Sequence, residues 1–141
     1  MLKPMACAAL LFAAAGPAQA APVILTISVP SPMVMPTHGK IEARIGLTLT
    51  NTAAAPVELS ASNKCAIGLW SASDAQGEEV DGRTICPMIY MPQSHTLPPG
   101  DWQSDAILAM DAAKFANGGH YKLHYRFWGV PADAVFTVRK R

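Results

Sequence analysis

The sequence has little charge of either sign, and after residue 20 it has no apolar run long enough to cross a membrane. Charged residues make up 15% of its 141 residues, and the formal net charge is +1 at pH 7. Such a balance offers no electrostatic attraction for nucleic acid or anionic lipid. We therefore predict no nucleic-acid partner and no membrane span in the mature chain.

Signatures of common enzymes are also missing. The chain contains no Gly-x-Ser-x-Gly motif, no His-Glu-x-x-His motif and no glycine-rich phosphate loop. Its densest acidic cluster, Glu78, Glu79 and Asp81, flanks a turn, and solvated side chains are the default interpretation of such a cluster. We predict that the protein is not an enzyme and, in the leading interpretation, holds no cofactor.

Residues 1–20 have the pattern of a cleaved secretory signal. Lys3 supplies the positive charge, residues 5–15 form an uninterrupted apolar run, and residues 18–20 are the small-x-small triplet that signal peptidase recognises. The run is too short to span a membrane, which takes about 20 apolar residues. We predict cleavage after Ala20, one mature domain over residues 21–141, and a periplasmic or secreted location.

Only three cysteines are present, and Cys7 would leave with the signal. Two cysteines in an oxidising compartment usually pair, although two separate thiols are the alternative. Residues 74–77, Asp-Ala-Gln-Gly, suit a type I turn. A hairpin symmetric about this turn places Cys65 opposite Cys86, at a Cα separation of about 4.5–5.5 Å that suits a disulfide. We predict that pairing.

Alternating apolar and polar side chains predict strands along most of the mature chain. Residues 41–50 alternate most clearly, and Pro87 marks one strand as an edge or a bulge. The predicted strands are residues 23–29, 41–50, 57–62, 65–72, 84–91, 102–109, 120–128 and 134–139. Residues 30–39 are interpreted as a long connection or an irregular edge, and only residues 111–117 look helical.

The number and spacing of these strands predict the fold. We expect an all-β, immunoglobulin-like antiparallel β-sandwich of about seven to eight strands with at most one short helix. In residues 120–127, His120, Lys122, His124 and Arg126 alternate with apolar side chains, which predicts a solvent-facing strip opposite an aromatic core strip. The two histidines of the strip lie roughly 13 Å apart, too far for one metal ion.

Several short motifs resemble a known family. They are residues 47–52 (Leu-Thr-Leu-Thr-Asn-Thr), 56–59, 69–74 with Gly77, 97–101 (Leu-Pro-Pro-Gly-Asp) and 119–123. In this order they resemble the immunoglobulin-like domain of the BsuPI family, named for an intracellular proteinase inhibitor. The resemblance covers residues 47–127 and implies a sandwich fold and a protease-inhibitor-like role. The predicted export signal and disulfide depart from an intracellular role.

Apolar segments with prolines are the candidate binding sites. Residues 33–38, 87–95 and 128–131 are expected as loops at the ends of the sandwich, and stiff apolar loops lose little entropy on docking. The leading hypothesis is a non-catalytic exported domain that binds a protein partner, with protease inhibition as one version. The predicted partner-binding residues are Met33, Met35, Tyr90, Met91 and Trp128.

The same segments support a second hypothesis. Thioether and imidazole groups are soft ligands that suit Cu(I), so the alternative function is periplasmic copper binding. The candidate ligands are Met33, Met35, His38, Met88, Met91 and His95. Methionine is equally a common gap-filler of apolar cores. A third hypothesis is a structural accessory domain of an envelope complex.

Overall fold

The computed structural model describes residues 22–141, so the predicted signal and its cleavage point lie outside the described residues. Strands make up most of the described chain, together with two single-turn 3-10 helices. The elements are β1 (Val23–Ser28), β2 (Met33–Met35), β3 (Lys40–Asn51), β4 (Val57–Ala61), η1 (Cys65–Ile67), β5 (Gly68–Ser73), β6 (Glu79–Arg83), β7 (Gln93–Leu97), β8 (Gly100–Asp111), η2 (Ala112–Phe115), β9 (Gly119–Phe127) and β10 (Val130–Lys140). Within residues 22–141, no helix has the length and apolar character needed to span a membrane.

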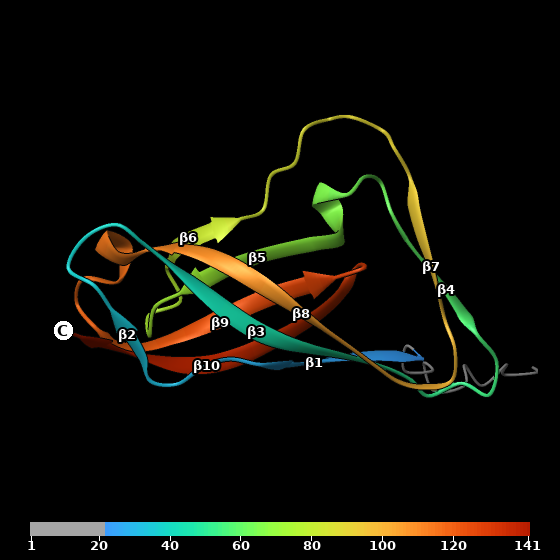
Figure 1. The fold of residues 1–141 in the computed structure, drawn as a ribbon, viewed down its shortest axis with the longest axis horizontal. Coiled ribbons are helices and arrows are strands. Elements are labelled where there is room, and N and C mark those ends of the chain that lie inside the picture. The colour runs from blue at the N-terminus through green and yellow to red at the C-terminus, as the bar shows by residue number, and fades with distance from the viewer. Residues whose placement is uncertain (1–21) are drawn as a thin grey trace, which may run out of the picture.

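These strands form two main sheets and a separate ribbon (Figure 1). The first sheet has the order β1-β3-β8 and is antiparallel. The second has the order β2-β10-β9-β5-β6, in which only β2 runs parallel to its neighbour. The ribbon β4-β7 continues beyond β3 and β8 at the right of Figure 1. The predicted all-β sandwich class is confirmed.

The core lies between the two sheets and follows the predicted alternation. On β3 the buried apolar side chains are Ala43, Ile45, Leu47 and Leu49, as the pattern of residues 41–50 predicts. On β9 they are Tyr121, Leu123, Tyr125 and Phe127, opposite the predicted polar strip. Full burial of one such side chain contributes about 1.5–3 kcal/mol. The alternation of apolar and polar residues therefore decides which face of each sheet packs against the core.

The expected helix is present only as η2, a single turn that begins after Asp111. The Asp111 carboxylate accepts a hydrogen bond from the backbone amide of Ala113 at 3.1 Å. Gly118 and Gly119, both with positive φ, then turn the chain into β9. The short helical segment predicted within residues 111–117 is confirmed, whereas η1 lies where the sequence predicted the start of a strand over residues 65–72.

The strand predicted over residues 84–91 is wrong. The strand that pairs with β5 is β6, which ends at Arg83, and the next strand, β7, begins at Gln93. Pro87 and Pro92 cannot donate to a ladder, so the chain between them leaves the sheet. The interpretation of residues 30–39 as a connection is also incomplete, because β2 lies within them.

The hairpin β5-β6 is asymmetric, unlike the predicted one. Gly77, at φ 84°, makes the connection a three-residue loop in which Asp74 pairs with Glu78. A second shift follows, because Ala72 faces Asp81 while Ser73 faces Glu79. Val80 is therefore the extra residue of a bulge.

The predicted disulfide is confirmed, although not by the predicted register. Cys65 and Cys86 are bonded, with their Cα atoms 5.8 Å apart. Cys65 lies in η1 and Cys86 in the loop after β6, so neither belongs to a paired strand. Consequently the disulfide ties a loop to the body of the domain.

Candidate functional site

Residues 84–92 leave the sandwich after β6 and arch away from it before β7 (Figure 1). We call them the braced loop, because residues 62–65, the bracing segment, hold them at both ends. Near one end, Cys86 is bonded to Cys65. Near the other, the backbone amide of Met91 donates to the carbonyl of Ser62 at 2.9 Å. The ends of the arch are therefore fixed to one short piece of chain.

Asn63 braces the middle of the arch. Its Nδ2 donates to the carbonyl of Pro87 at 3.3 Å and to the carbonyl of Ile89 at 3.0 Å. Its Oδ1 accepts from the backbone amide of Ala66 at 3.0 Å, which orients the carboxamide. One side chain thus ties the carbonyls on both sides of Met88.

The braced loop exposes five apolar side chains to solvent. Ile85 is 87% exposed, Met88 104% and Tyr90 80%, and Ile89 and Met91 are exposed as well. These five exposed apolar side chains all lie within residues 85–91, and a concentration of exposed apolar side chains is typical of binding sites. Sequence reasoning identified Tyr90 and Met91 as partner-binding residues and Met88 as a candidate ligand, but it missed Ile85, Ile89 and the brace Asn63.

Met33 and Met35 are not loop residues, and this corrects both hypotheses that used them. They lie in β2, which pairs with the last residues of β10, and they are only 4% and 2% exposed. The segment alternates, so Val34 points to solvent while both methionines pack in the core. Their thioethers fill core space and are not presented to a partner.

His95 and Trp128 also differ from the expectation of exposed loop residues. The His95 ring lies 4.5 Å from the Trp102 ring and 5.7 Å from the Trp128 ring, between centroids. Its Nε2 is buried and has no hydrogen-bond partner in the structure. Trp128 is half-buried and begins the tight turn between β9 and β10 at φ 50°. Both side chains belong to an aromatic cluster at this end of the sandwich.

The six candidate copper ligands are therefore not brought together. Met33 and Met35 are buried on β2, which lies at the left of Figure 1, whereas β7, which carries His95, lies at the right. His38 is exposed in the connection to β3, and Met88 is on the arch. Residues 22–141 contain no group of three or more His, Cys, Asp or Glu side chains placed to hold a metal ion. Copper binding stays a prediction without a converged ligand set.

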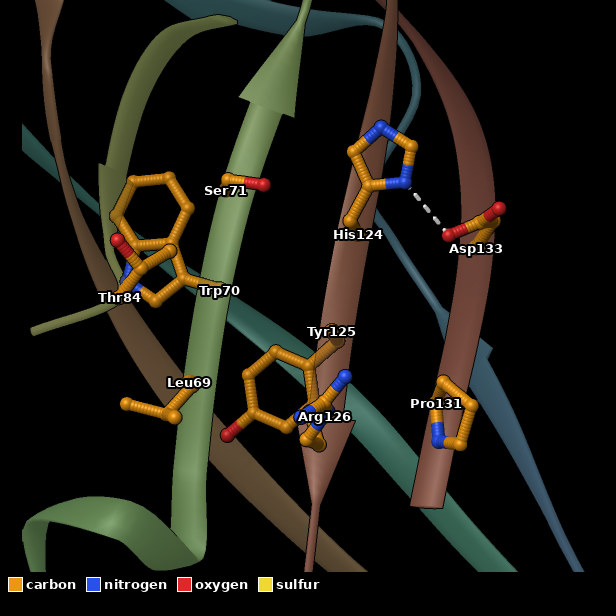
Figure 2. A pocket seen from close by; sticks show the side chains of 9 residues that line it. All are labelled: Leu69, Trp70, Ser71, Thr84, His124, Tyr125, Arg126, Pro131 and Asp133. Atoms are coloured by element: carbon orange, nitrogen blue, oxygen red, sulfur yellow. Dashed lines mark hydrogen bonds and ion pairs between the residues drawn. The ribbon is translucent and has the colours of Figure 1, made fainter. Parts of the chain in front are cut away.

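A polar row crosses the outer face of the second sheet. His124 on β9 lies beside Asp133 on β10, with Nδ1 2.7 Å from Oδ1 (Figure 2). On the other side, Nε2 of His124 is 3.0 Å from the hydroxyl of Ser73 on β5. An open hollow of about 400 Å³ lies on this face and includes His124, Asp133 and Arg126 in its lining. The predicted polar strip is confirmed, but sequence reasoning missed the Ser73–His124–Asp133 connection.

The order hydroxyl, imidazole, carboxylate is that of a nucleophile, a base and an orienting acid. Acyl transfer also needs hydrogen-bond donors aimed at the developing oxyanion. The backbone of Ser73 lies in β5, an interior strand between β6 and β9, where ladder hydrogen bonds occupy the amides. The row accordingly supports a structural polar contact between three strands better than a reaction.

Asp81 is a buried charged side chain, and the sequence did not predict its burial. It is 7% exposed and accepts from the Asp111 amide at 2.9 Å and from Lys114 Nζ at 3.1 Å. Sequence reasoning placed it in a solvated acidic cluster, which is wrong for this residue. Because β6 bulges at Val80, the Asp81 side chain turns inward and joins β6 to the start of η2.

The comparisons with known proteins name no family. No protein-family model and no curated protein matches the chain. Solved structures similar to it include β-glucosidases from Listeria innocua and Erythrobacter marinus, at 10% and 13% sequence identity and a TM-score of 0.40 each. The match covers 82% of this chain, and this chain spans 16% of each enzyme. A likeness this distant carries no argument about activity.

Proposed function

We propose that this protein is an exported binding domain, without a reaction of its own, that holds a protein partner through the braced loop. The observation that carries the proposal is the combination of exposure and bracing. Five apolar side chains of the loop face solvent, while Cys65, Asn63 and Ser62 fix its backbone. A loop that is ordered before binding loses less entropy on docking, and this favours affinity.

Export is part of the proposal. The signal pattern of residues 1–20 and the disulfide both fit a periplasmic or secreted protein. The resemblance to the BsuPI family suggests protease inhibition as one version of the binding role. A structural accessory domain in an envelope complex is the alternative, and it would use the sheet faces instead of the loop.

Affinity capture from an envelope extract of the source cells tests the proposal. The oxidised mature chain is compared with a Met88→Ala/Tyr90→Ala variant and with Ile107→Ala, in which an exposed apolar side chain on β8 is removed instead. We expect a partner that the wild-type chain and the Ile107 variant retain and the loop variant loses. A partner retained equally by all three would favour the accessory role, and no specific partner would contradict binding.

A further inference from the structure

We infer that the Cys65–Cys86 disulfide is a site of thiol–disulfide exchange, at which a dithiol reductant attacks Cys86, expels Cys65 as a thiolate and so frees one end of the braced loop. Two observations carry this assignment. The bond lies outside the buried core, and the guanidinium of Arg83 lies beside one of its two sulfur atoms. The effect on partner binding rests on the proposed function, whereas the exchange itself does not.

The disulfide has the position of one that a reductant can reach. Both cysteines are partly exposed, and neither belongs to the buried core or to a paired strand. Cys65 also borders the open hollow of about 270 Å³ that the bracing segment and the braced loop line together. Disulfides buried between sheets are structural, whereas exposed ones are the labile and regulatory class.

The chain around each cysteine carries positive charge and no negative charge. Residues 59–73 and 82–93 contain two charged side chains, Lys64 and Arg83, and both are cations. A thiolate is more stable beside a cation than in neutral surroundings. Exchange, which expels a thiolate, is therefore favoured here by the neighbouring residues.

Arg83 makes the two sulfur atoms unequal. It is the last residue of β6, where its backbone pairs with that of Trp70 on β5. Its Nη2 donates to Sγ of Cys65 at 3.6 Å. The sulfur whose thiolate is better stabilised is the better leaving group. Cys65 is accordingly the sulfur that leaves, and Cys86, on the braced loop, is the sulfur that is attacked.

Exchange takes two substitutions at sulfur. In the first, one thiolate of the dithiol attacks Sγ of Cys86, a mixed disulfide forms, and the electron pair of the broken bond leaves on Sγ of Cys65. In the second, the other thiolate of the dithiol attacks the reductant's own sulfur and expels Cys86. The protein disulfide gains two electrons, the dithiol is oxidised to a disulfide, and its two protons end on the cysteine thiols.

Reduction should loosen the loop and leave the sandwich folded. The links that remain from the bracing segment are the hydrogen bonds of Asn63 to Pro87 and Ile89 and that of Met91 to Ser62. The core contains neither cysteine, so its packing does not depend on the bond. A loop that is less ordered before docking loses more entropy on binding, and the reduced chain should hold a partner less tightly.

Reduction of the folded mature chain by dithiothreitol tests the exchange. Free thiols are alkylated and counted by mass spectrometry, while far-UV circular dichroism follows the sheet. We expect a rate proportional to the dithiothreitol concentration and an unchanged spectrum. Arg83→Gln should slow reduction at least about 3-fold, because the leaving thiolate loses its cation, and Arg83→Lys should restore most of the rate. Lys122→Gln, which removes an exposed cation on β9, is the matched control.

The direction of the Arg83→Gln effect separates the two possible roles of this side chain. If Arg83 only held the loop in place, its loss would let the loop open more often and would speed reduction. Faster or unchanged reduction in Arg83→Gln would therefore overturn the assignment. Reduction that begins only when urea unfolds the sheet would overturn it as well.

Glutathione locates the sulfur that is attacked. It has one thiol, so its mixed disulfide with the protein can be trapped by acid and mapped by mass spectrometry of peptides. We expect glutathione on Cys86 in at least about 3-fold excess over Cys65, and a smaller excess in Arg83→Gln. Equal labelling, or an excess on Cys65, would contradict the assigned direction.

Capture from the envelope extract connects the exchange to binding. The oxidised chain is compared with the reduced and alkylated chain, which we expect to retain at least about 5-fold less of a loop-dependent partner. Equal capture by both forms would overturn the control of binding by reduction. A disulfide that resists dithiothreitol in a chain that captures a partner would overturn this inference and leave the proposed function standing. Exchange as expected, with no partner captured by either form, would do the reverse.

Discussion

Residues 30–36 and residues 87–92 are both rich in proline and methionine, yet they occupy opposite environments. In the first, Met33 and Met35 are buried at 4% and 2% exposure. In the second, Met88 and Met91 are exposed at 104% and 62%. Each segment holds two methionines between prolines, but the two have different neighbours in the fold.

The difference arises from what each segment can pair with. Residues 33–35 pair with the edge of β10 as a parallel strand, so that alternate side chains point into the core. Residues 87–92 have proline at both ends, and side-chain and disulfide links from the bracing segment take the place of a ladder. Backbone partners, not residue types, decide which methionines are available for binding.

The largest expected effect is on the free energy of unfolding, which should depend on the methionines of the first segment and not on those of the second. Met35→Ala should lower the free energy of unfolding by about 2–5 kcal/mol, because it leaves a cavity in a packed core. Met88→Ala should change it by less than about 0.5 kcal/mol, because the side chain makes no buried contact. Urea denaturation of the oxidised chains measures both values. Equal losses would contradict the contrast between the segments.

Removal of the disulfide should loosen the second segment and spare the first. A Cys65→Ser/Cys86→Ser variant loses a cross-link across 21 residues, which the chain-entropy model values at about 3 kcal/mol. We expect the lower stability in urea, together with faster proteolytic nicking within residues 84–92. Reduced wild-type protein is the matched control and should behave like the variant. Nicking first near β2 would show that the disulfide does not hold the loop.

Much of the sandwich could be predicted from the sequence, because alternation is a local signal. The core faces of β3 and β9 and the short η2 turn follow from neighbouring residues. The disulfide partners also followed, since only two of the three cysteines lie outside the predicted signal. The exact register did not, because the Gly77 loop and the Val80 bulge each shift it by one residue.

The features that define the candidate site depend on distant contacts, which a local pattern does not contain. Asn63 meets the carbonyls of Pro87 and Ile89 across 24 and 26 residues of chain. The pairing of β2 with the end of β10 likewise joins the two ends of the domain. Sequence reasoning found the apolar loop but could not find its brace, and it could not separate the buried methionines from the exposed ones.

A smaller effect is expected when only the brace is removed. Asn63→Ala deletes two hydrogen bonds to the loop and one to Ala66, so the free energy of unfolding should fall by about 1–2 kcal/mol. Protection of the Met91 amide from hydrogen exchange should fall, because its bond to Ser62 depends on a fixed loop. Amides of β2 should exchange at the wild-type rate. Unchanged protection of Met91 would show that the disulfide alone fixes the arch.

The smallest effect concerns the sandwich alone and appears only at alkaline pH. Burial of Tyr125 on β9 raises the pKa of its phenol above the ordinary value of 10.0, because the charged form is poorly solvated there. The folded state therefore holds the proton more tightly than the unfolded state. The resulting stability is complete below the unfolded pKa and is lost as the pH rises from about 10 through the raised folded pKa.

Tyr125→Phe provides the measurement for this last effect. Urea midpoints of the wild-type chain should fall from about pH 10 upward, and those of the variant should fall less. Tyr121, whose pKa is also raised by burial and secondly by the charge of Asp74, leaves a residual slope in the variant. Loop accessibility, followed by nicking within residues 84–92, should not change until the sandwich itself unfolds. Loss of the loop's protection before global unfolding would mean that the arch depends on the β9 face as well as on its own brace.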